Sequence, residues 1–179
     1  MSEKAIAIRS KACIVRAFFQ LLEKDRFDSI TISEIAAHAE LDRRTFYRHF
    51  KTKEDILGYY IKSTAAEYET ALTSNKTFDN RAIAESFFTV CRTQRYQLQL
   101  LIRQNLSHLL LNEISKAFVT YQDKYADREE LEHPDRDYRL AYHIGGFWNI
   151  MNRWLTDGAR ESPAEMAAVI DRLVRQVQI

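Results

Sequence analysis

Apolar residues recur at helical spacing along most of the chain, and this pattern predicts an all-α protein. Over residues 4–24 they share one face of a first helix: Ile14, Ala17, Phe18, Leu21 and Leu22. A short second helix, a third over about 42–50 and a fourth over about 53–73 follow closely. Further helices are expected near 79–92, 94–104, 106–126, 136–157 and 163–178. We therefore predict about nine helices, with a loop over 73–80 as the first clear break.

Capping residues mark the ends of several of these helices. The second and fourth helices follow capping boxes at Thr31–Glu34 and Thr52–Asp55, in which each side chain satisfies a free amide of the other residue. Asp42 is a good N-cap for the third helix. Near the end of the chain, Gly158 suits a C-cap, and Ser162–Glu165 combines an N-cap, a first-turn proline and a capping glutamate. Local chemistry therefore supports the boundaries that periodicity predicts.

The third predicted helix has two unlike faces. Phe46 and Phe50 share one side, and the opposite side carries Arg44, Tyr47, Arg48 and Lys51, with Arg43 in the first turn. Two short helices separated by a tight turn, here at Glu40-Leu41, are the layout of a helix-turn-helix, whose second helix enters the DNA major groove. Arginine reads guanine bidentately, whereas Lys and Tyr more often hold phosphates. The pattern predicts DNA binding; the alternative is a basic face that is merely solvated.

Composition and charge agree with a soluble DNA-binding protein. The chain has 179 residues, 46% of them hydrophobic, and only 4 glycines and 2 prolines. No run of about 18 uncharged apolar residues occurs, and the start has no apolar signal core, so we expect a cytoplasmic protein without membrane insertion. Residues 1–53 carry a net charge of +4 and the rest −3, although the total is only +1. This asymmetry suggests a basic module for a polyanion, attached to a body with another task.

The two cysteines give little sign of special chemistry. Cys13 and Cys91 have no neighbouring CxxC or His spacing. We expect reduced, buried thiols, with a redox switch as the alternative. The five histidines are scattered without metal-ligand spacing, so neither a metal nor another cofactor is expected.

The stretch ITISEIAAHAELDRRTFYRHFKTKEDIL resembles the DNA-binding segment of the TetR family of bacterial repressors. The hydrophobic positions, TFYRHF and the following KTKEDIL are in register, and the similarity covers about residues 10–57. One position departs from the family pattern, because the family usually has glycine in the turn where this chain has Glu40. If that position requires positive φ, glutamate strains it, and its carboxylate also lies close to DNA.

The resemblance implies which side chains contact DNA. Members of the family touch phosphates at the positions of Thr31 and Ser33, read bases at those of Arg43, Arg44 and Thr45, and hold the backbone at those of Tyr47, His49 and Lys53. Arg48 lies on the same exposed face. Lys53 adds its charge to amides at the start of a helix, a favourable place for phosphate. For His49, a proton switch is the alternative to a hydrogen bond with phosphate.

The resemblance also implies two domains: a helix-turn-helix DNA-binding domain over 1–53, and a helical effector-binding and dimerisation domain over 54–179. Rings that can surround an apolar effector are Phe87, Phe88, Tyr96, Phe118, Tyr121, Tyr142 and Trp148, with His108 or His143 as a polar anchor. Aromatic residues at helical spacing can equally form ordinary core, and that alternative stays open for each of them.

The last two predicted helices carry apolar stripes suited to dimerisation. One consists of Leu140, Ile144, Phe147, Met151 and Leu155, and the other of Met166, Ile170, Leu173, Val174 and Val177. Gly145 and Gly146 each cost helix propensity about 1 kcal/mol, which close approach to another helix can offset. The resemblance implies a homodimer through about 136–157 and 163–178, and packing within one chain is the alternative.

We therefore expect a sequence-specific transcriptional regulator, foremost a dimeric repressor that an unknown small molecule releases from a near-palindromic operator in double-stranded DNA. The alternative is a TetR-fold regulator controlled by a protein partner, which would lack a cavity and expose an apolar patch on its body. An enzyme is not expected, since no Ser/His/Asp set with motif support, glycine-rich phosphate loop or acidic pair in context is present.

Overall fold

The computed structural model describes residues 3–74, 80–125 and 128–176, and within these ranges the chain forms α-helices and no strand. The helices are α1 (Glu3–Leu22), α2 (Ile32–His38), α3 (Arg43–His49), α4 (Glu54–Ser74), α5 (Asn80–Thr93), α6 (Arg95–Arg103), α7 (Ser107–Tyr125), α8 (Arg128–Glu132), α9 (Arg136–Thr156) and α10 (Pro163–Gln176). The all-α prediction is confirmed. The short α8 was not predicted, because its sequence REELE offers no apolar period.

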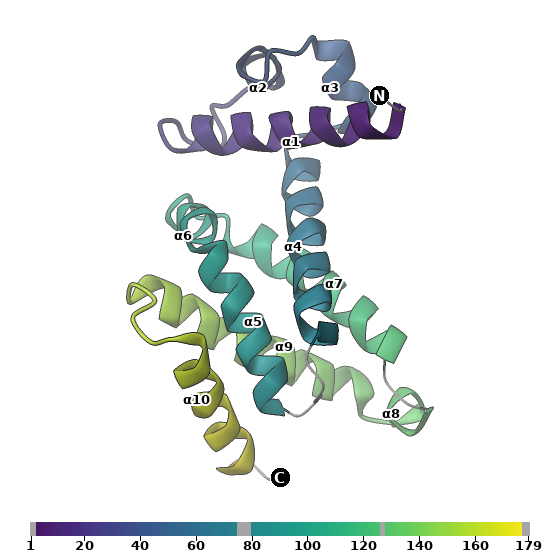
Figure 1. Ribbon diagram of the computed structural model, residues 1–179, viewed down its shortest axis with the longest axis vertical. Coiled ribbons are helices and arrows are strands. Elements are labelled where there is room, and N and C mark those ends of the chain that lie inside the picture. Colours follow the sequence, from purple (N-terminus) through teal and green to yellow (C-terminus); the bar gives the residue numbers. More distant parts are fainter. Residues whose placement is uncertain (1–2, 75–79, 126–127, 177–179) are drawn as a thin grey trace.

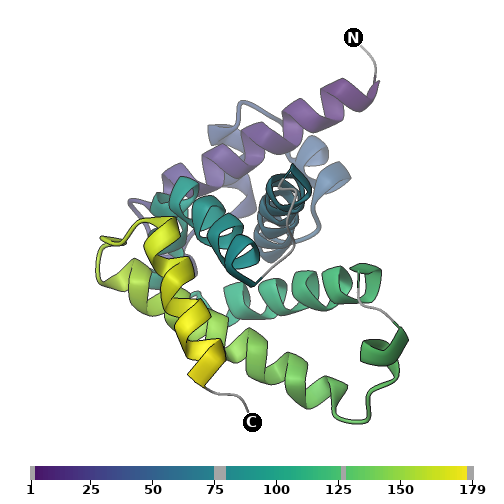
Figure 2. The ribbon, with the colours of Figure 1, turned by 60° about the horizontal axis from the view of Figure 1, so that its bottom comes forward.

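The helices form a small end layer and a larger body. α1, α2 and α3 make up the layer, and α4 runs from it into the body of α5–α10 (Figure 1). In the body α10 lies along α5, and α7 and α9 extend together towards α8 (Figure 2). α4 is thus the helix that belongs to both parts. None of the described helices is long and apolar enough to cross a membrane.

Aromatic rings hold the small layer together. The ring of Phe18 on α1 packs edge-on against Phe27, with centroids 6.1 Å apart, and Phe46 on α3 lies 6.0 Å from Phe50. Phe18 and Phe46 are completely buried, as is Ile35 on α2. Each helix therefore turns its predicted apolar face to a shared core, which leaves the other side of α3 in solvent.

The predicted capping pairs are confirmed. Thr31 Oγ1 accepts the Glu34 N–H at 3.2 Å, and the Glu34 carboxylate accepts the Thr31 N–H at 2.8 Å. The Thr52–Asp55 and Ser162–Glu165 pairs make the same reciprocal bonds. Asp42 accepts the Thr45 N–H at 2.7 Å. Short-range signals thus define where these helices begin.

Glu40 adopts the left-handed conformation considered above from the family resemblance, with a φ of 56°. It follows Ala39, the C-cap of α2. The Leu41 N–H donates to Ala36 O and the Glu40 N–H donates to Ala37 O, which is a Schellman ending. α6 and α9 end in the same way, but with Asn105 (φ 60°) and Gly158 (φ 92°) in that position. Asparagine and glycine tolerate this conformation, whereas glutamate is strained in it.

Replacing Glu40 by asparagine is therefore expected to stabilise the protein by about 1 kcal/mol, because the φ of 56° is retained at lower cost. For a chain of this size that gain raises the Tm by about 2–4 °C in a calorimetric scan. The matched control is Asn105→Glu, which makes the reverse exchange in an equivalent turn and should lower the Tm by a similar amount. A lower Tm for Glu40→Asn would contradict the strain.

The apolar stripe of α9 is used within the chain. Leu140, Met151 and Leu155 are buried, and Phe147 packs edge-on against Phe87 with centroids 5.6 Å apart. The alternative of intramolecular packing is therefore correct for this stripe. It leaves the opposite face of α9 in solvent, including Tyr138, Tyr142 and Gly146.

On α10, Met166 and Ile170 are buried where the helix lies along α5, whereas Leu173 and Val174 remain exposed. Val177, the last member of the predicted stripe, lies outside the described residues. Only part of the α10 stripe is therefore available to another molecule.

Candidate nucleic-acid interface and internal cavity

The side of α3 that faces away from the core is basic and exposed. Arg43, Arg44, Tyr47 and Arg48 are all exposed, while Phe46 between them is completely buried. Asp42 caps the helix, and the Thr45 N–H that it accepts lowers the pKa of its carboxyl group. The buried ring of Phe46 and the Asp42 cap hold α3 in place. The arginines therefore sit on a rigid helix but are not needed to hold it.

The arginines make only weak contacts within the protein. The Arg43 guanidinium lies 5.9 Å from the centroid of the Tyr47 ring, and Arg48 Nη2 donates to Thr45 Oγ1 at 3.4 Å. Contacts of this length are easily exchanged for better ones. Arg44 is exposed on the same helix. These side chains are therefore available for an external anion or base edge.

At the start of α2, Thr31 and Ser33 are exposed beside α3. The Thr31 hydroxyl is already engaged with Glu34: it donates to Oε2 at 2.7 Å and accepts the N–H. The Thr31 N–H, and after it the Thr31 hydroxyl, donate to the carboxylate of Glu34 and lower its pKa. Thr31 therefore brings one spare lone pair to the surface, because Glu34 accepts its N–H and its carbonyl accepts the Ile35 N–H, and Ser33 brings a hydroxyl.

His49 and Lys53, predicted to hold the DNA backbone, are turned partly inward. His49 is half-buried, and its Nε2 is buried without a hydrogen-bond partner among the described residues. Burial, with help from the charges of Arg48 and Lys11, lowers the pKa of His49, so the imidazole is neutral at neutral pH. The Lys53 ammonium donates to backbone carbonyls of Phe27, Asp28 and Ile30. Their contact with DNA stays a prediction.

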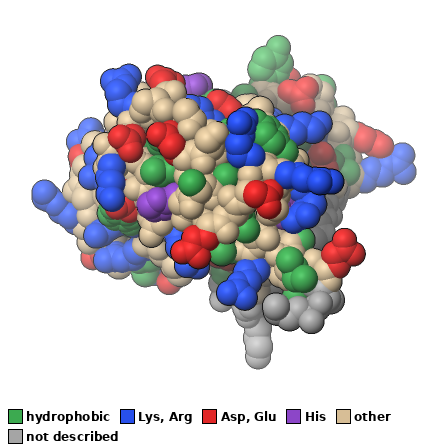
Figure 3. Space-filling model, turned by 90° about the horizontal axis from the view of Figure 1, so that it is seen from above, with side chains coloured by type: hydrophobic (Ala, Val, Ile, Leu, Met, Phe, Trp, Pro, Cys, Tyr) green, Lys and Arg blue, Asp and Glu red, His purple; other side chains and the backbone are tan. Residues whose placement is uncertain are grey.

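Seen from above the small layer, Lys and Arg side chains project at several points around the molecule, with Asp and Glu between them (Figure 3). The positive charge is therefore dispersed over this face. Discrimination between DNA sequences must then come from the placement of individual arginines, because bulk attraction to phosphates does not depend on sequence.

A cavity of about 390 Å³ lies in the body between α4, α5 and α7. Its walls are largely apolar: Ile61, Ala65, Phe87, Val90, Leu98, Ile114, Ala117, Phe118 and Met151. Lys116 and Glu113, which also line it, form an ion pair of 2.6 Å. Cys91 contributes a buried free thiol, whose pKa burial raises to about 12. The size and lining suit a small apolar or amphipathic molecule.

Two of the aromatic residues predicted to surround an effector, Phe87 and Phe118, lie in this wall. The other described candidates do not line this cavity, and their contact with an effector stays a prediction. Phe88 is completely buried against Trp154, Trp148 packs on the core, and Tyr96, His108, Tyr142 and His143 are exposed. Helical spacing groups residues by face but does not tell which face meets empty space. The Tyr121 side chain lies outside the described residues.

The residues that sequence reasoning missed are mostly small or aliphatic. Ala65 on α4 and Ala117 on α7 leave room between helices that would otherwise fill it, and Ile61 and Ile114 complete the facing walls. In the sequence, the signal for this cavity was the presence of alanines within otherwise bulky apolar stripes. Among the described residues, no group of three or more His, Cys, Asp or Glu side chains is placed to hold a metal ion.

Comparison with known proteins gives the arrangement a context. The family profile described as "Bacterial regulatory proteins, tetR family" matches residues 14–60, and the one described as "Transcriptional regulator C-terminal region" matches residues 83–176. The HTH-type transcriptional regulator YxbF of Bacillus subtilis is 36% identical over 67 residues, 37% of this chain and 18% of that protein. The dhaKLM operon transcriptional activator DhaS of Lactococcus lactis is 30% identical over 61 residues, 34% of this chain and 33% of that protein. The similar segments thus cover no more than a third of either relative.

Solved structures share the fold over nearly the whole chain. The dihydroxyacetone kinase operon activator DhaS superposes with a TM-score of 0.59 at 18% identity, covering 94% of this chain and 96% of that one. The fatty acid degradation regulator FadR from Bacillus halodurans gives 0.63 at 17% identity, covering 92% and 93%. With the basic helix-turn-helix at one end and both family profiles matched in turn, the chain belongs to the TetR family of transcriptional regulators.

Proposed function

We propose that the protein is a dimeric, ligand-responsive repressor that binds a near-palindromic operator. The observation that carries the proposal is the exposed basic face of α3. The buried Phe46 anchors this helix, and α4 connects its layer to an apolar cavity. Residues 1–53 form the DNA-binding domain in this proposal, and residues 54–179 bind the effector and dimerise. We refer to α1–α3 as the reading head.

Within the reading head, Arg43, Arg44 and Thr45 are proposed to read bases, because they occupy the first turn of the helix that enters the major groove. The proposed contacts to the DNA backbone are Thr31, Ser33, Tyr47, Arg48 and His49. A phosphate beside His49 would favour its protonated form, offsetting the lowered pKa. Lys53, which the family resemblance assigns to the same backbone, has its ammonium turned towards protein carbonyls.

A small apolar or amphipathic effector is proposed for the cavity. One relative, a TetR-family repressor FadR from Thermus thermophilus, is solved in complex with lauroyl-CoA; it superposes with a TM-score of 0.50 at 16% identity, covering 94% of this chain and 95% of that one. α4 contributes Ile61, Ala65 and Glu69 to the cavity wall, so a ligand there bears directly on the helix that carries the reading head. Regulation requires the effector to bind the arrangement that does not fit DNA more tightly than the arrangement that does. A difference of about 1–3 kcal/mol between these two binding free energies is enough.

Control by a protein partner is the second candidate, and the exposed rings of α9 favour it: Tyr138 is 81% exposed and Tyr142 is 62% exposed. The cavity of about 390 Å³ favours the small molecule, because a regulator that answers only to a protein has no need of it. DhaS is described as an activator and the Thermus FadR as a repressor. We propose repression because occlusion of a promoter requires only DNA binding.

Selection of the purified full-length protein on random DNA duplexes, at near-physiological salt, tests the proposed function. Sequencing of the retained duplexes is expected to reveal a near-palindrome whose half-sites lie about one DNA turn apart, roughly 34–36 Å, or somewhat more. The absence of any enriched sequence would contradict operator recognition and bring the protein-partner hypothesis forward.

Dimerisation is proposed through α10 and the solvent face of α9. A Cβ placed on Gly146 meets nothing within 4 Å in the chain, so intramolecular packing does not explain this glycine. Gly146→Ala is therefore expected to stabilise α9 by about 1 kcal/mol and to preserve the dimer. Gly146→Leu, which also favours helix, should weaken the dimer at least tenfold in sedimentation equilibrium, because its side chain blocks close approach of a second helix. Equal dimerisation by both variants would contradict this interface.

A further inference from the structure

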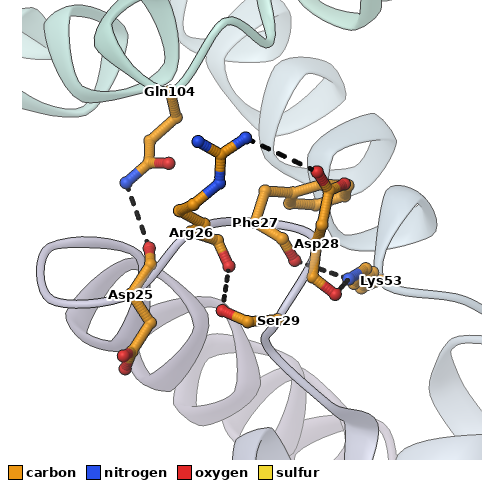
Figure 4. Close-up of polar contacts among 7 residues, drawn as sticks. All are labelled: Asp25, Arg26, Phe27, Asp28, Ser29, Lys53 and Gln104. Carbon is orange, nitrogen blue, oxygen red and sulfur yellow. Dashed lines mark hydrogen bonds and ion pairs between the residues drawn. The ribbon is translucent and has the colours of Figure 1, made fainter.

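The turn that joins α1 to α2, residues 23–31, is held from two sides by side chains of other helices (Figure 4). Lys53 reaches it from the start of α4, and Gln104 reaches it from the end of α6. Phe27, in the middle of the turn, is buried against Phe18. The turn is therefore an ordered part of the reading head.

Lys53 uses its ammonium on this turn. Its Nζ donates to Phe27 O at 2.5 Å, to Ile30 O at 3.0 Å and to Asp28 O at 3.2 Å, and it lies 4.4 Å from the centroid of the Phe27 ring. A lysine ammonium has three N–H donors, and three carbonyls accept from it here. Hydrogen bonds from a charged donor are stronger than neutral ones. Contact with a DNA phosphate would require Lys53 to give up some of these bonds.

Gln104 holds the other side of the same turn. Its Nε2 donates to Leu22 O at 2.8 Å and to Asp25 O at 3.0 Å. Carbonyls at the end of a helix have no partner within that helix, so this amide satisfies the Leu22 carbonyl at the end of α1 and also holds the Asp25 carbonyl in the turn. Gln104 directly follows α6, whose Leu98 lines the cavity, while Lys53 directly precedes α4, which also lines it. Both helices that hold the turn therefore reach the cavity.

We propose that Lys53 and Gln104 are positioning residues that clamp the turn 23–31 between α4 and α6 and so set the orientation of the reading head on the body. In this arrangement Lys53 acts through the turn and does not bind a phosphate. A movement of α4 relative to α6 must either carry the turn along or break one set of bonds. The consequence for operator binding rests on the proposed function, whereas the clamp itself is a property of the protein without DNA.

Amide hydrogen exchange of the full-length protein without DNA tests the clamp directly. In Gln104→Met, amides of residues 22–30 are expected to exchange about tenfold faster, equivalent to about 1.4 kcal/mol. The matched control is Gln99→Met: Gln99 Nε2 also donates to a carbonyl, Leu155 O at 2.7 Å, but within the body. It should leave residues 22–30 unchanged. Unaltered exchange at residues 22–30 in Gln104→Met, or the same acceleration there in both variants, would overturn the clamp.

The salt dependence of DNA binding tests the role of Lys53. Lys53→Met is expected to weaken binding about tenfold at every salt concentration without changing the slope of log K against log salt. Loss of one phosphate contact from each protomer of the dimer would instead lower that slope by about 1.8, which is about 0.9 for each contact. Lys51→Met, which removes an exposed lysine two residues away, is the control for an ordinary loss of surface charge. A slope lowered by about 1.8 in Lys53→Met would place Lys53 at a phosphate in each protomer and overturn its positioning role.

A second variant covers the case in which Lys53→Met does not fold. Lys53→Arg keeps the charge, but a planar guanidinium cannot direct its donors to three carbonyls around one point. Faster exchange at residues 22–30 is therefore expected, and wild-type exchange there would count against the clamp. If the wild-type protein binds no DNA at all, the proposed function fails while the exchange measurements still decide whether the clamp exists.

Discussion

Alanine at Arg43 or Arg44 is expected to weaken binding to the selected operator by about 1–3 kcal/mol per arginine, and binding to random DNA far less. Both side chains are exposed in the first turn of α3, and a bidentate arginine–guanine pair supplies discrimination of that size. An arginine that reads a base contributes little on a sequence without that base, where only its charge acts. Titrations of both variants against both DNAs at one salt concentration give the two losses.

Lys51→Ala is the control for charge alone, because Lys51 is exposed close to the end of α3. Its loss should weaken operator and random DNA by similar factors. If the arginine variants behave in the same way, with equal losses on both DNAs, then Arg43 and Arg44 do not read bases. The recognition contacts would have to be sought elsewhere on the reading head.

Phe46→Ala is expected to cost about 3–5 kcal/mol of folding stability, the largest effect that we predict for a single substitution. Phe46 is completely buried, and its ring packs against Phe50 at the junction of α3 with the rest of the layer. Its removal leaves a cavity in a small core that has few other contacts to α3. Urea denaturation followed by helical circular dichroism measures the loss, which should appear as early melting of the reading head.

Tyr47→Ala is the matched comparison, since it removes the adjacent aromatic residue, whose exposed ring meets the Phe46 ring only edge-on, with centroids 5.7 Å apart. Tyr47 is 48% exposed, so its truncation should cost less than about 1 kcal/mol of stability while it weakens DNA binding. Comparing the two substitutions therefore distinguishes the effect of α3 on folding stability from its effect on DNA binding. Comparable destabilisation by both substitutions would contradict the two-faced helix on which the proposed interface rests.

Many helix boundaries, in the reading head and in the body, were predictable from the sequence because their signals are local. The Thr31–Glu34, Thr52–Asp55 and Ser162–Glu165 pairs act over three residues, and each capping pair has the expected bonds. The separation of Phe46 from Arg44 and Arg48 follows from helical geometry alone. At Glu40 the family resemblance raised positive φ as a condition, because glycine is usual there, and the structure has a φ of 56° at this residue.

Contacts between distant segments were beyond the reach of the sequence. The same apolar spacing describes a stripe buried within the chain and one that meets a second copy, and only the fold assigned Leu140, Met151 and Leu155 to the interior. Likewise, the adjacent rings of Phe87 and Phe88 differ in that one faces the cavity and the other Trp154.

By itself, the sequence determined the helices other than the short α8, the capping pairs and the two faces of α3, since these depend on residues within about one helical turn. Only the tertiary structure showed where the helices leave a cavity and which groups a charged side chain meets. Lys53 illustrates the difference: its sequence position suggests a phosphate contact, but its ammonium meets carbonyls more than twenty residues away. The packing of whole helices decides which distant residue a side chain meets. Residue spacing along the chain does not contain that information.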